Sequence, residues 1–570
     1  MAGEDAEPRT VESIEVTLFR QILMVPFAIE AADDAGRLAS GRERVSAIAD
    51  GLGEPWREIT AERWRHLPTD AGAEGEALAA AYAELVYFEP AVQRYLFGWA
   101  GEQAKEAPIR IWQRQDVREL DISIGEGDER DRWKLQVDRL NLYLFDTGNA
   151  MLVVEFAFDP ALVPGTGDAR DRLPRLAAVM RLIECSRRTF PPFFFPEDKG
   201  QLVPGFFPSE FNWVAEPELP SVVAPRTPAD FIDHAARRQI PALHQAWRAL
   251  LAGLPLDSDP EPPSEGFLLS QLGDDRAFSI VVIGVDDIGA IAEPDWVRLA
   301  MCDGPGSGWP YGRAFLQGWH EHQAYDRHFH GSEGGTRYLF SGYSFAMIGT
   351  ARRPADEERC DFRDTFAEHG RRHYFQLCLI AYFQKIALLT LSERLADATL
   401  ATESTAAAAH AIERDILQFT HRYWFETLSA QVQAQEIFKL LRANLHLRPL
   451  YQQVRQEVRE ADALATSDEQ QGIARNQNRL NIIAGVGLTL AVVVGIFGMN
   501  VFHGEEHPNW EIDFFVLAFA IGSVLAGFGA LYAWADELER WFSGRRRLKW
   551  FMISIPLMLG AIGLLGMIFG

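Results

Sequence analysis

Three long apolar runs near the C-terminal end constrain this chain more than any other feature. They cover residues 480–498, 514–535 and 551–570, and none of them contains a charged side chain. About 20 consecutive apolar residues form a helix that crosses the hydrocarbon core of a bilayer. Pro556 in the third run is compatible with a span, because membrane helices accommodate proline. The sequence therefore predicts three membrane spans, with a re-entrant or surface helix as the alternative for the third.

The charges that flank these runs predict their orientation. Arg475 and Arg479 precede the first run, the 501–513 loop carries only acidic charges, and the basic segment RRRLK at 545–549 follows the second run. Basic loops stay on the cytoplasmic side of a membrane. We therefore expect a multi-pass protein of the bacterial inner (plasma) membrane with a large cytoplasmic N-terminal part.

Charge and cysteine content exclude other classes. The chain has 55 Lys and Arg against 80 Asp and Glu, a formal net charge of -25. Basic and acidic side chains balance within 471–570, so the excess negative charge belongs to residues 1–470. A nucleic-acid partner needs a broad basic surface and is not expected. The four cysteines are far apart in the sequence, which is typical of a reducing compartment rather than of a disulfide framework.

The N-terminal part has the pattern of a mixed α and β fold. Branched and aromatic runs predict strands at 14–28, 109–124, 133–145, 151–158, 267–288 and 338–348. The segments YLFDTGNAM at 143–151 and YLFSGYSFAM at 338–347 resemble each other, which suggests a repeated hairpin.

Helical periodicity takes over from about Cys360. It runs to Asp397 and again over residues 404–445, and Pro449 predicts a helix break after Arg448. Nothing in the sequence forbids one continuous helix over 450–500.

These patterns predict an α+β cytosolic domain followed by long helices and an all-α membrane domain. Pro-rich segments at 203–230 and 254–266 indicate connectors between two lobes. The predicted division is an α/β lobe at 1–220, a second α/β part at 221–359, an antiparallel helix pair at 360–448, the cytosolic part of a stalk helix at 449–479, the first span at 480–500, an outer loop at 501–513, the second span at 514–535, a basic cytosolic loop at 536–550 and the third span at 551–570.

A motif at the end of the first span points to a family. The span NRLNIIAGVGLTLAVVVGIFGMN at 478–500 ends in Gly498-Met499-Asn500, the run RRRLKW follows at 545–550, and FETLSAQVQAQEIFKLLRANLHL precedes the stalk at 425–447. Together these segments resemble the CorA family of divalent-cation channels, including its ZntB branch, over about residues 360–550. The outer loop VFHGEEHPNWEID departs from the family's usual Met-Pro-Glu-Leu, and the long N-terminal part and the third span are additions.

The resemblance implies a funnel-shaped homopentamer in which five copies of the first span line the pore. Gly498, Met499 and Asn500 would form the selectivity filter, where a ring of neutral amide oxygens holds a hydrated Mg²⁺ without trapping it. Helical spacing back from Asn500 predicts a pore lining of Ile482, Val486, Thr489, Val493 and Ile496. The alternative is that Thr489 bonds back to its own helix and that the Val and Ile stripe faces lipid or the second span.

The outer loop carries a cluster of acidic side chains. Glu505, Glu506, Glu511 and Asp513 would be multiplied fivefold at the mouth, where they would raise the local cation concentration. The alternative is an ordinary acidic loop that follows the positive-inside rule.

A histidine-rich segment in the cytosolic part is a second candidate. WHEHQAYDRHFH at 319–330 places His320, His322, His328 and His330 in a short, turn-like stretch. HxH pairs on a strand put two imidazoles on one face, so a metal site is one interpretation. The other is a polar loop whose histidines form hydrogen bonds.

We therefore expect passive, potential-driven influx of Mg²⁺, with Co²⁺ or Ni²⁺ as further substrates, regulated by the cytosolic domain and requiring no cofactor. Divalent cations, Zn²⁺ among them, are also candidate regulators. The alternatives are a ZntB-like zinc transporter and a ligand-gated channel whose enlarged N-terminal part senses an unknown ligand. A membrane-tethered metal-dependent enzyme is a distant alternative, because the sequence has no GxSxG, HExxH or Gly-rich phosphate loop. An enzyme is therefore not expected.

Overall fold

The computed structural model describes residues 10–33, 36, 39–60, 81–98, 101–125, 130–158, 173–193, 206–217, 219, 235–236, 241–259, 262–306, 311–331, 334–351, 362–400 and 405–498. The chain divides into two compact units, Met1–Ala461 and Asp462–Gly570. It is an α+β protein, in which a large mixed sheet with helices is followed by a helical C-terminal region. This much of the predicted fold class is confirmed.

The sheet of the first unit contains twelve strands of the described residues. They are β1 (Val16–Ala31), β2 (Trp56–Glu58), β3 (Ile109–Arg114), β4 (Val117–Ile124), β5 (Asp131–Phe145), β6 (Asn149–Phe158), β7 (Glu210–Ala215), β8 (Phe267–Gln271), β9 (Phe278–Val285), β10 (Ala324–Phe329), β11 (Gly335–Ser341) and β12 (Ser344–Thr350). The main path runs β10-β11-β12-β9-β1-β6-β5-β3-β2, while β4 joins β5 to β7 and β8 pairs with β1. β9 and β12 are parallel, and β1 is antiparallel to both of its neighbours on the main path, β6 and β9.

The predicted boundary at residue 220 falls inside this sheet. β1 comes from the 1–220 segment and β9 from the 221–359 segment, and the two strands pair from Val16↔Val285 to Met24↔Phe278. The Pro-rich connectors therefore do not separate two lobes, and Met1–Ala461 is one compact unit.

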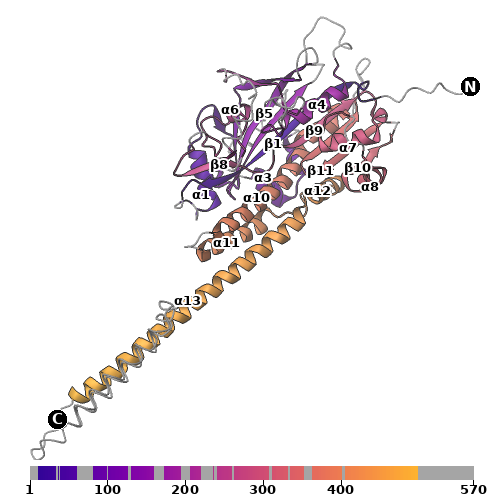
Figure 1. The fold of residues 1–570 in the computed structure, drawn as a ribbon. Coiled ribbons are helices and arrows are strands. Elements are labelled where there is room, and N and C mark those ends of the chain that lie inside the picture. The colour runs from indigo at the N-terminus through magenta and orange to yellow at the C-terminus, as the bar shows by residue number, and fades with distance from the viewer. Residues whose placement is uncertain are drawn as a thin grey trace, which may run out of the picture. The chain divides into compact units, whose positions relative to one another are not determined.

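Helices cover both faces of the sheet. The described elements are α1 (Gly41–Asp50), α3 (Pro90–Phe97), η1 (Gly101–Glu106), α4 (Leu176–Ser186), α6 (Gln245–Leu250), η5 (Ile288–Ala290), α7 (Glu293–Met301), α8 (Arg313–Gln323), η7 (Phe362–Phe366), α9 (Ala367–His369), η8 (Gly370–Tyr374), α10 (Phe375–Leu400), α11 (Thr405–Tyr423), α12 (Val432–Asn444) and α13 (Leu447–Gly498). Figure 1 shows α10, α11 and α12 close together beside the sheet. Because both faces are covered, β1 is a nearly continuous apolar run, and it is buried from Val16 to Ile29 except at Arg20.

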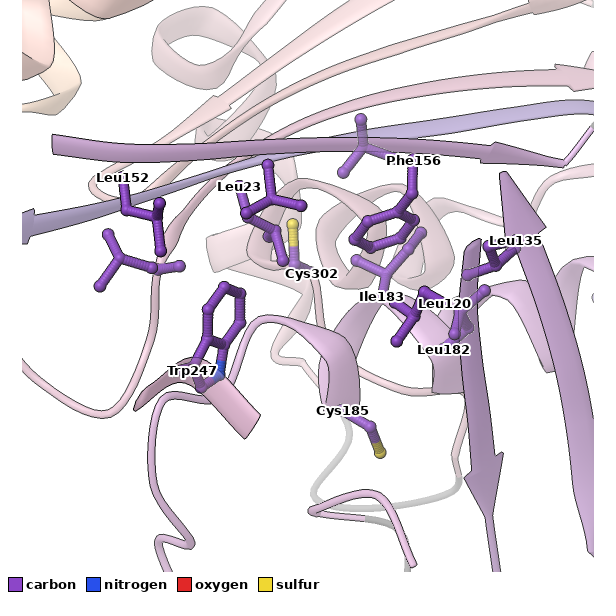
Figure 2. Packing of buried hydrophobic residues seen from close by; sticks show 14 of the residues in the cluster. Leu23, Leu120, Leu135, Leu152, Phe156, Leu182, Ile183, Cys185, Trp247 and Cys302 are labelled. Atoms are coloured by element: carbon purple, nitrogen blue, oxygen red, sulfur yellow. The ribbon is translucent and has the colours of Figure 1, made fainter. Parts of the chain in front are cut away.

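One face of the sheet packs on α4, α6 and α7. Leu23, Leu152 and Phe156 project from β1 and β6 toward Ile183 of α4 and Trp247 of α6, and all five side chains are fully buried or nearly so (Figure 2). The alternate residues of the same strands join a second cluster with α10, α11 and α12. The sheet therefore separates two hydrophobic cores.

The two similar sequence segments form equivalent hairpins. In the hairpin of β5 and β6 Tyr143 lies opposite Met151, and in that of β11 and β12 Tyr338 lies opposite Met347. All four side chains belong to the core on the α10 side. The repeated pattern thus gives two hairpins that present the same residue types to one layer of helices.

The α10 region contains the one helical stretch within the described residues that is long and apolar enough to cross a membrane. It runs over Ala367–Ala398, and 83% of its most apolar window is buried. A helix that is apolar on all sides is expected in the core of a large unit. The first predicted span lies in α13 up to Gly498, and the second and third predicted spans lie outside the described residues.

The helices before the stalk differ from the prediction in two ways. The predicted helix at 404–445 is interrupted after Tyr423, whose carbonyl accepts a hydrogen bond from Gln384 Nε2 at 2.7 Å, and Glu89 N donates to Leu428 O at 2.9 Å. Tertiary hydrogen bonds therefore replace helical ones in this segment. The predicted break at Pro449 lies instead at His446, which has a left-handed φ of 55°. Pro449 lies in the first turn of α13, where its missing N–H costs nothing.

An acidic cluster at the end of β1 gives the stability a pH dependence. Burial, reinforced by Glu393, Asp257 and Asp397 and opposed by Arg44, raises the pKa of Glu30 from 4.5 to about 7. A carboxyl group whose folded pKa is raised costs stability as the pH rises from 4.5 through about 7. Glu30→Gln is therefore expected to stabilise the protein by ~2 kcal/mol at pH 8 and to have little effect at pH 4.5. Denaturant unfolding at both pH values checks this, and an equal gain at both would contradict it.

Candidate functional site

The stalk helix α13 carries the predicted pore. It is continuous over 52 residues, from Leu447 to Gly498, which corresponds to ~78 Å at 1.5 Å per residue. Its first turns belong to the first unit, where Val454, Val458 and Ala461 are buried in the core on the α10 side. The positions of these three residues recur at helical spacing, so one face of the early helix is fixed by packing.

The part of α13 in the second unit has apolar side chains on its surface. Ile473, Leu480 and Ile483 are 57%, 65% and 68% exposed. At about 100° per residue the three residues fall within a stripe roughly 80° wide. A stripe of large apolar side chains at heptad-like spacing is typical of a helix that packs against other helices.

The opposite face of this segment is polar. Gln471, Arg475 and Asn478 lie about 120–180° from the centre of the apolar stripe, and Arg475 Nη2 donates to Gln471 Oε1 at 3.5 Å along that face. Ile482, the first predicted pore-lining residue, continues the same face. The helix therefore has two faces of different chemistry up to the start of the predicted first span.

The other predicted pore and mouth residues fall into two groups, one on α13 and one outside the described residues. Val486, Thr489, Val493 and Ile496 are positions of α13, and Gly498 is its last residue. Met499, Asn500, Glu505, Glu506, Glu511 and Asp513 lie outside the described residues.

The predicted histidine segment is not a turn. His320 and His322 lie on α8, His328 lies on β10, and His330 follows it. Two residues separated by one position on a helix point about 160° apart, so the one-face argument for HxH on a strand does not apply to His320 and His322. Within the described residues these four histidines do not gather into a cluster of metal-ligating groups.

His320 instead takes part in a hydrogen-bonded network. Its Nε2 contacts Glu293, and its Nδ1 lies 2.8 Å from Arg337 Nη2. Asp326 accepts two further hydrogen bonds from Arg337, at 2.8 and 2.9 Å. This is the hydrogen-bonding alternative that the sequence left open.

Sequence reasoning missed a network of buried charges on the α10 side of the sheet. Glu155 is fully buried; its Oε2 lies 3.0 Å from Arg139 Nε, its Oε1 lies 2.8 Å from Arg371 Nε, and Arg20 contacts it as well. Burial alone would raise the pKa of Glu155, but the guanidinium groups of Arg139, Arg20 and Arg371 outweigh burial and lower it. The available signal was an ionisable residue inside an apolar strand run, as with Arg20 in 14–28 and Glu155 in 151–158.

Comparisons of the chain with protein-family models, curated proteins and solved structures found no match.

Proposed function

We propose that this chain is the subunit of a homopentameric channel for divalent metal cations in the bacterial inner membrane. The observation that carries the proposal is the two-faced α13, which ends at Gly498 of the Gly498-Met499-Asn500 motif. In a cyclic assembly every copy presents the same face to the axis. The polar face of Gln471, Arg475 and Asn478 would then line an aqueous path, and the apolar stripe would contact neighbouring helices.

The chemistry of the motif supports Mg²⁺ as the principal substrate, with Co²⁺ and Ni²⁺ as further substrates. Mg²⁺ gives up its water shell reluctantly, so neutral amide oxygens at Asn500 would select a hydrated ion by contacts to its waters. A divalent ion gains ~4.6 kcal/mol by entering through an inside-negative potential of about 100 mV. Influx therefore needs neither a nucleotide nor a redox cofactor, and we propose transport rather than catalysis.

The test is uptake into liposomes that contain the purified protein and a cation-sensitive dye. Mg²⁺, Co²⁺, Ni²⁺ and Zn²⁺ are each added outside, with and without an imposed inside-negative potential. The proposal expects potential-driven entry of Mg²⁺, Co²⁺ or Ni²⁺. Zn²⁺ entry that follows a proton gradient instead would favour the zinc-transporter alternative, and no flux of any cation would contradict the proposal.

The orientation of α13 gives a separate prediction. If the polar face lines the path, five copies of Arg475 form a positive ring that lowers the local cation concentration. Arg475→Gln is therefore expected to raise the initial rate of Mg²⁺ uptake severalfold at low ionic strength, and the gain should shrink as salt screens the ring. Arg459, an exposed α13 residue about 160° away from Arg475 around the helix axis, gives the matched control Arg459→Gln. Equal effects of the two substitutions would argue against the proposed orientation.

A further inference from the structure

Three adjacent strands change character at the same level on the α10 side of the sheet. On this face the side chains are apolar at one end of the three strands and ionisable or amide at the other. From the apolar end they are Met24, Ile22 and Arg20 on β1, Phe145, Tyr143, Asn141 and Arg139 on β5, and Met151, Val153 and Glu155 on β6. The register places Glu155 opposite both Arg139 and Ile22. Segments far apart in sequence thus build one polar region in an apolar layer.

Burying these charged side chains costs free energy, so their presence in an apolar layer calls for an explanation. A buried ion pair is seldom more stable than apolar residues of similar volume, because desolvation offsets the attraction. Here Arg139 donates through Nη2 to Arg371 O at 3.2 Å, and its guanidinium lies 4.3 Å from the centre of the Phe375 ring. The arginines are therefore held in place on the wall of a cavity rather than left free to move.

The cavity lies between β5 and the start of α10. Its volume is about 210 Å³, and it is lined by Arg139, Asn141 and Tyr143 of β5 on one side and by Arg371, Arg372 and Gln376 on the other. Arg371 and Arg372 belong to η8, a π-helical turn, and such turns in longer helices occur frequently at functional sites.

Arg139 and Arg371 also line a larger open groove of about 1240 Å³. Seven basic side chains and three acidic ones line this groove, in a chain whose formal net charge is -25. Five of these basic side chains also pair with Glu155, Asp116 or Glu216, which do not line the groove, so the groove would attract anions through the N–H donors of its arginines rather than through a large net charge. Arginine in particular presents a planar fork of donors that matches phosphate oxygens.

Two buried amides in the cavity have acceptors without a partner. Asn141 and Gln376 are 6% and 2% exposed, and within the described residues neither Asn141 Oδ1 nor Gln376 Oε1 accepts a hydrogen bond. Gln376 Nε2 donates to Glu84, which also lines the cavity, at 2.8 Å. A buried polar atom without a partner costs free energy and calls for an explanation. These acceptors would be satisfied by the several hydroxyl or amine groups of an organic ligand, whereas inorganic phosphate near neutral pH offers only one or two P–OH donors, on the same group that the arginines would hold.

We propose that the cavity and the groove bind a small molecule that combines phosphate with hydroxyl or amine groups, the chemistry shared by nucleotides and sugar phosphates. Arg139, Arg371 and Arg372 bind the phosphate, while Asn141 and Gln376 accept hydrogen bonds from the donors of the same molecule. This site is independent of the proposed transport, because binding is measured without any flux.

Isothermal titration calorimetry on the full-length protein in detergent tests the proposal, with ATP, glucose 6-phosphate and inorganic phosphate as probes. ATP or glucose 6-phosphate is expected to bind more tightly than inorganic phosphate, and the tighter of the two identifies the class. Absence of binding by all three probes would overturn the proposal. So would equal affinity for all three, because the amides would then recognise nothing.

Two substitutions assign the site. Arg372→Gln is expected to weaken binding of the preferred probe by roughly tenfold, and Arg327→Gln, at an exposed arginine paired with Glu436 at 3.3 Å outside the cavity, is expected to change nothing. Equal weakening by both would show diffuse attraction and overturn the proposal.

Asn141→Leu should weaken binding of the organic phosphate and leave inorganic phosphate unaffected. Thermal unfolding of each variant without ligand shows whether it folds. If Asn141→Leu does not fold, Arg372→Gln decides, because the side chain of Arg372 has one hydrogen bond within the described residues, from Nε to Glu368 at 3.4 Å. Wild-type affinity in a folded Arg372→Gln would remove the proposed site.

Discussion

Asn500→Ala is expected to abolish potential-driven uptake of divalent cations into liposomes while the protein still assembles. The substitution removes the amide oxygens that would contact the water shell of the ion at the end of the first span. A side chain at the mouth of a pore contributes little to packing, so size-exclusion chromatography should give the same oligomer as the wild type. We expect uptake of Mg²⁺ to fall by at least about tenfold, equivalent to ~1.4 kcal/mol at the selecting step.

Asn476 provides the matched control for this prediction. It is an exposed asparagine on α13, upstream of the first predicted span. Asn476→Ala should leave uptake unchanged, because Asn476 lies between Leu480 and Ile483 around the helix axis, where alanine keeps an apolar contact, and belongs to neither the proposed polar face nor the motif. Wild-type flux and selectivity in Asn500→Ala would remove the assignment of Gly498-Met499-Asn500 as a filter, whatever the other variants show.

Local pattern was sufficient to find most of the sheet. The predicted runs at 133–145 and 151–158 agree with β5 (Asp131–Phe145) and β6 (Asn149–Phe158) to within two residues at every end. The reason is that branched and aromatic residues bounded by a turn such as Asp146-Thr147-Gly148 specify a hairpin through neighbours in sequence. The pairing of β1 with β9 depends on residues more than 250 positions apart, and local pattern carries no information on it.

The candidate sites show the same limit. The sequence predicts the histidine segment as a single local unit, but a helix followed by a strand separates its members, and His320 is hydrogen-bonded to Glu293 and Arg337. The charge network around Glu155 is the opposite case, because Arg20, Arg139 and Arg371 come from three distant segments. Arg20 and Glu155 were visible in the sequence as ionisable exceptions in apolar runs, and only the fold shows that they and the other two arginines are partners.

Glu155→Gln is expected to cause the largest loss of stability among the substitutions considered. The amide keeps the shape of the side chain but removes the negative charge that faces Arg20, Arg139 and Arg371. Removing one partner from a buried ion pair costs about 3–5 kcal/mol, because the remaining charge stays buried. Denaturant unfolding at pH 7 measures the loss. Glu119→Gln on β4, which breaks the exposed pair with Lys134, is the matched control and should cost less than about 1 kcal/mol.

The pH dependence of this loss identifies its cause. Because the folded pKa of Glu155 lies below 4.5, the network contributes fully above pH 4.5, and the contribution is lost as the pH falls through the folded pKa. The difference between wild type and Glu155→Gln should therefore shrink in acid. A difference that is constant with pH would indicate lost packing rather than lost charge.

The same variant connects the network to the proposed phosphate site. Without the carboxylate, the region around Arg139 and Arg371 has a higher net positive charge. A bound anion would then replace part of the negative charge that Glu155 supplies in the wild type. A ligand at 100 times its dissociation constant stabilises the folded state by ~2.7 kcal/mol. Millimolar phosphate should therefore raise the unfolding midpoint of Glu155→Gln more than that of the wild type. A general salt effect would raise both midpoints equally, and that result would separate the buried network from anion binding, leaving Glu155 a purely structural role.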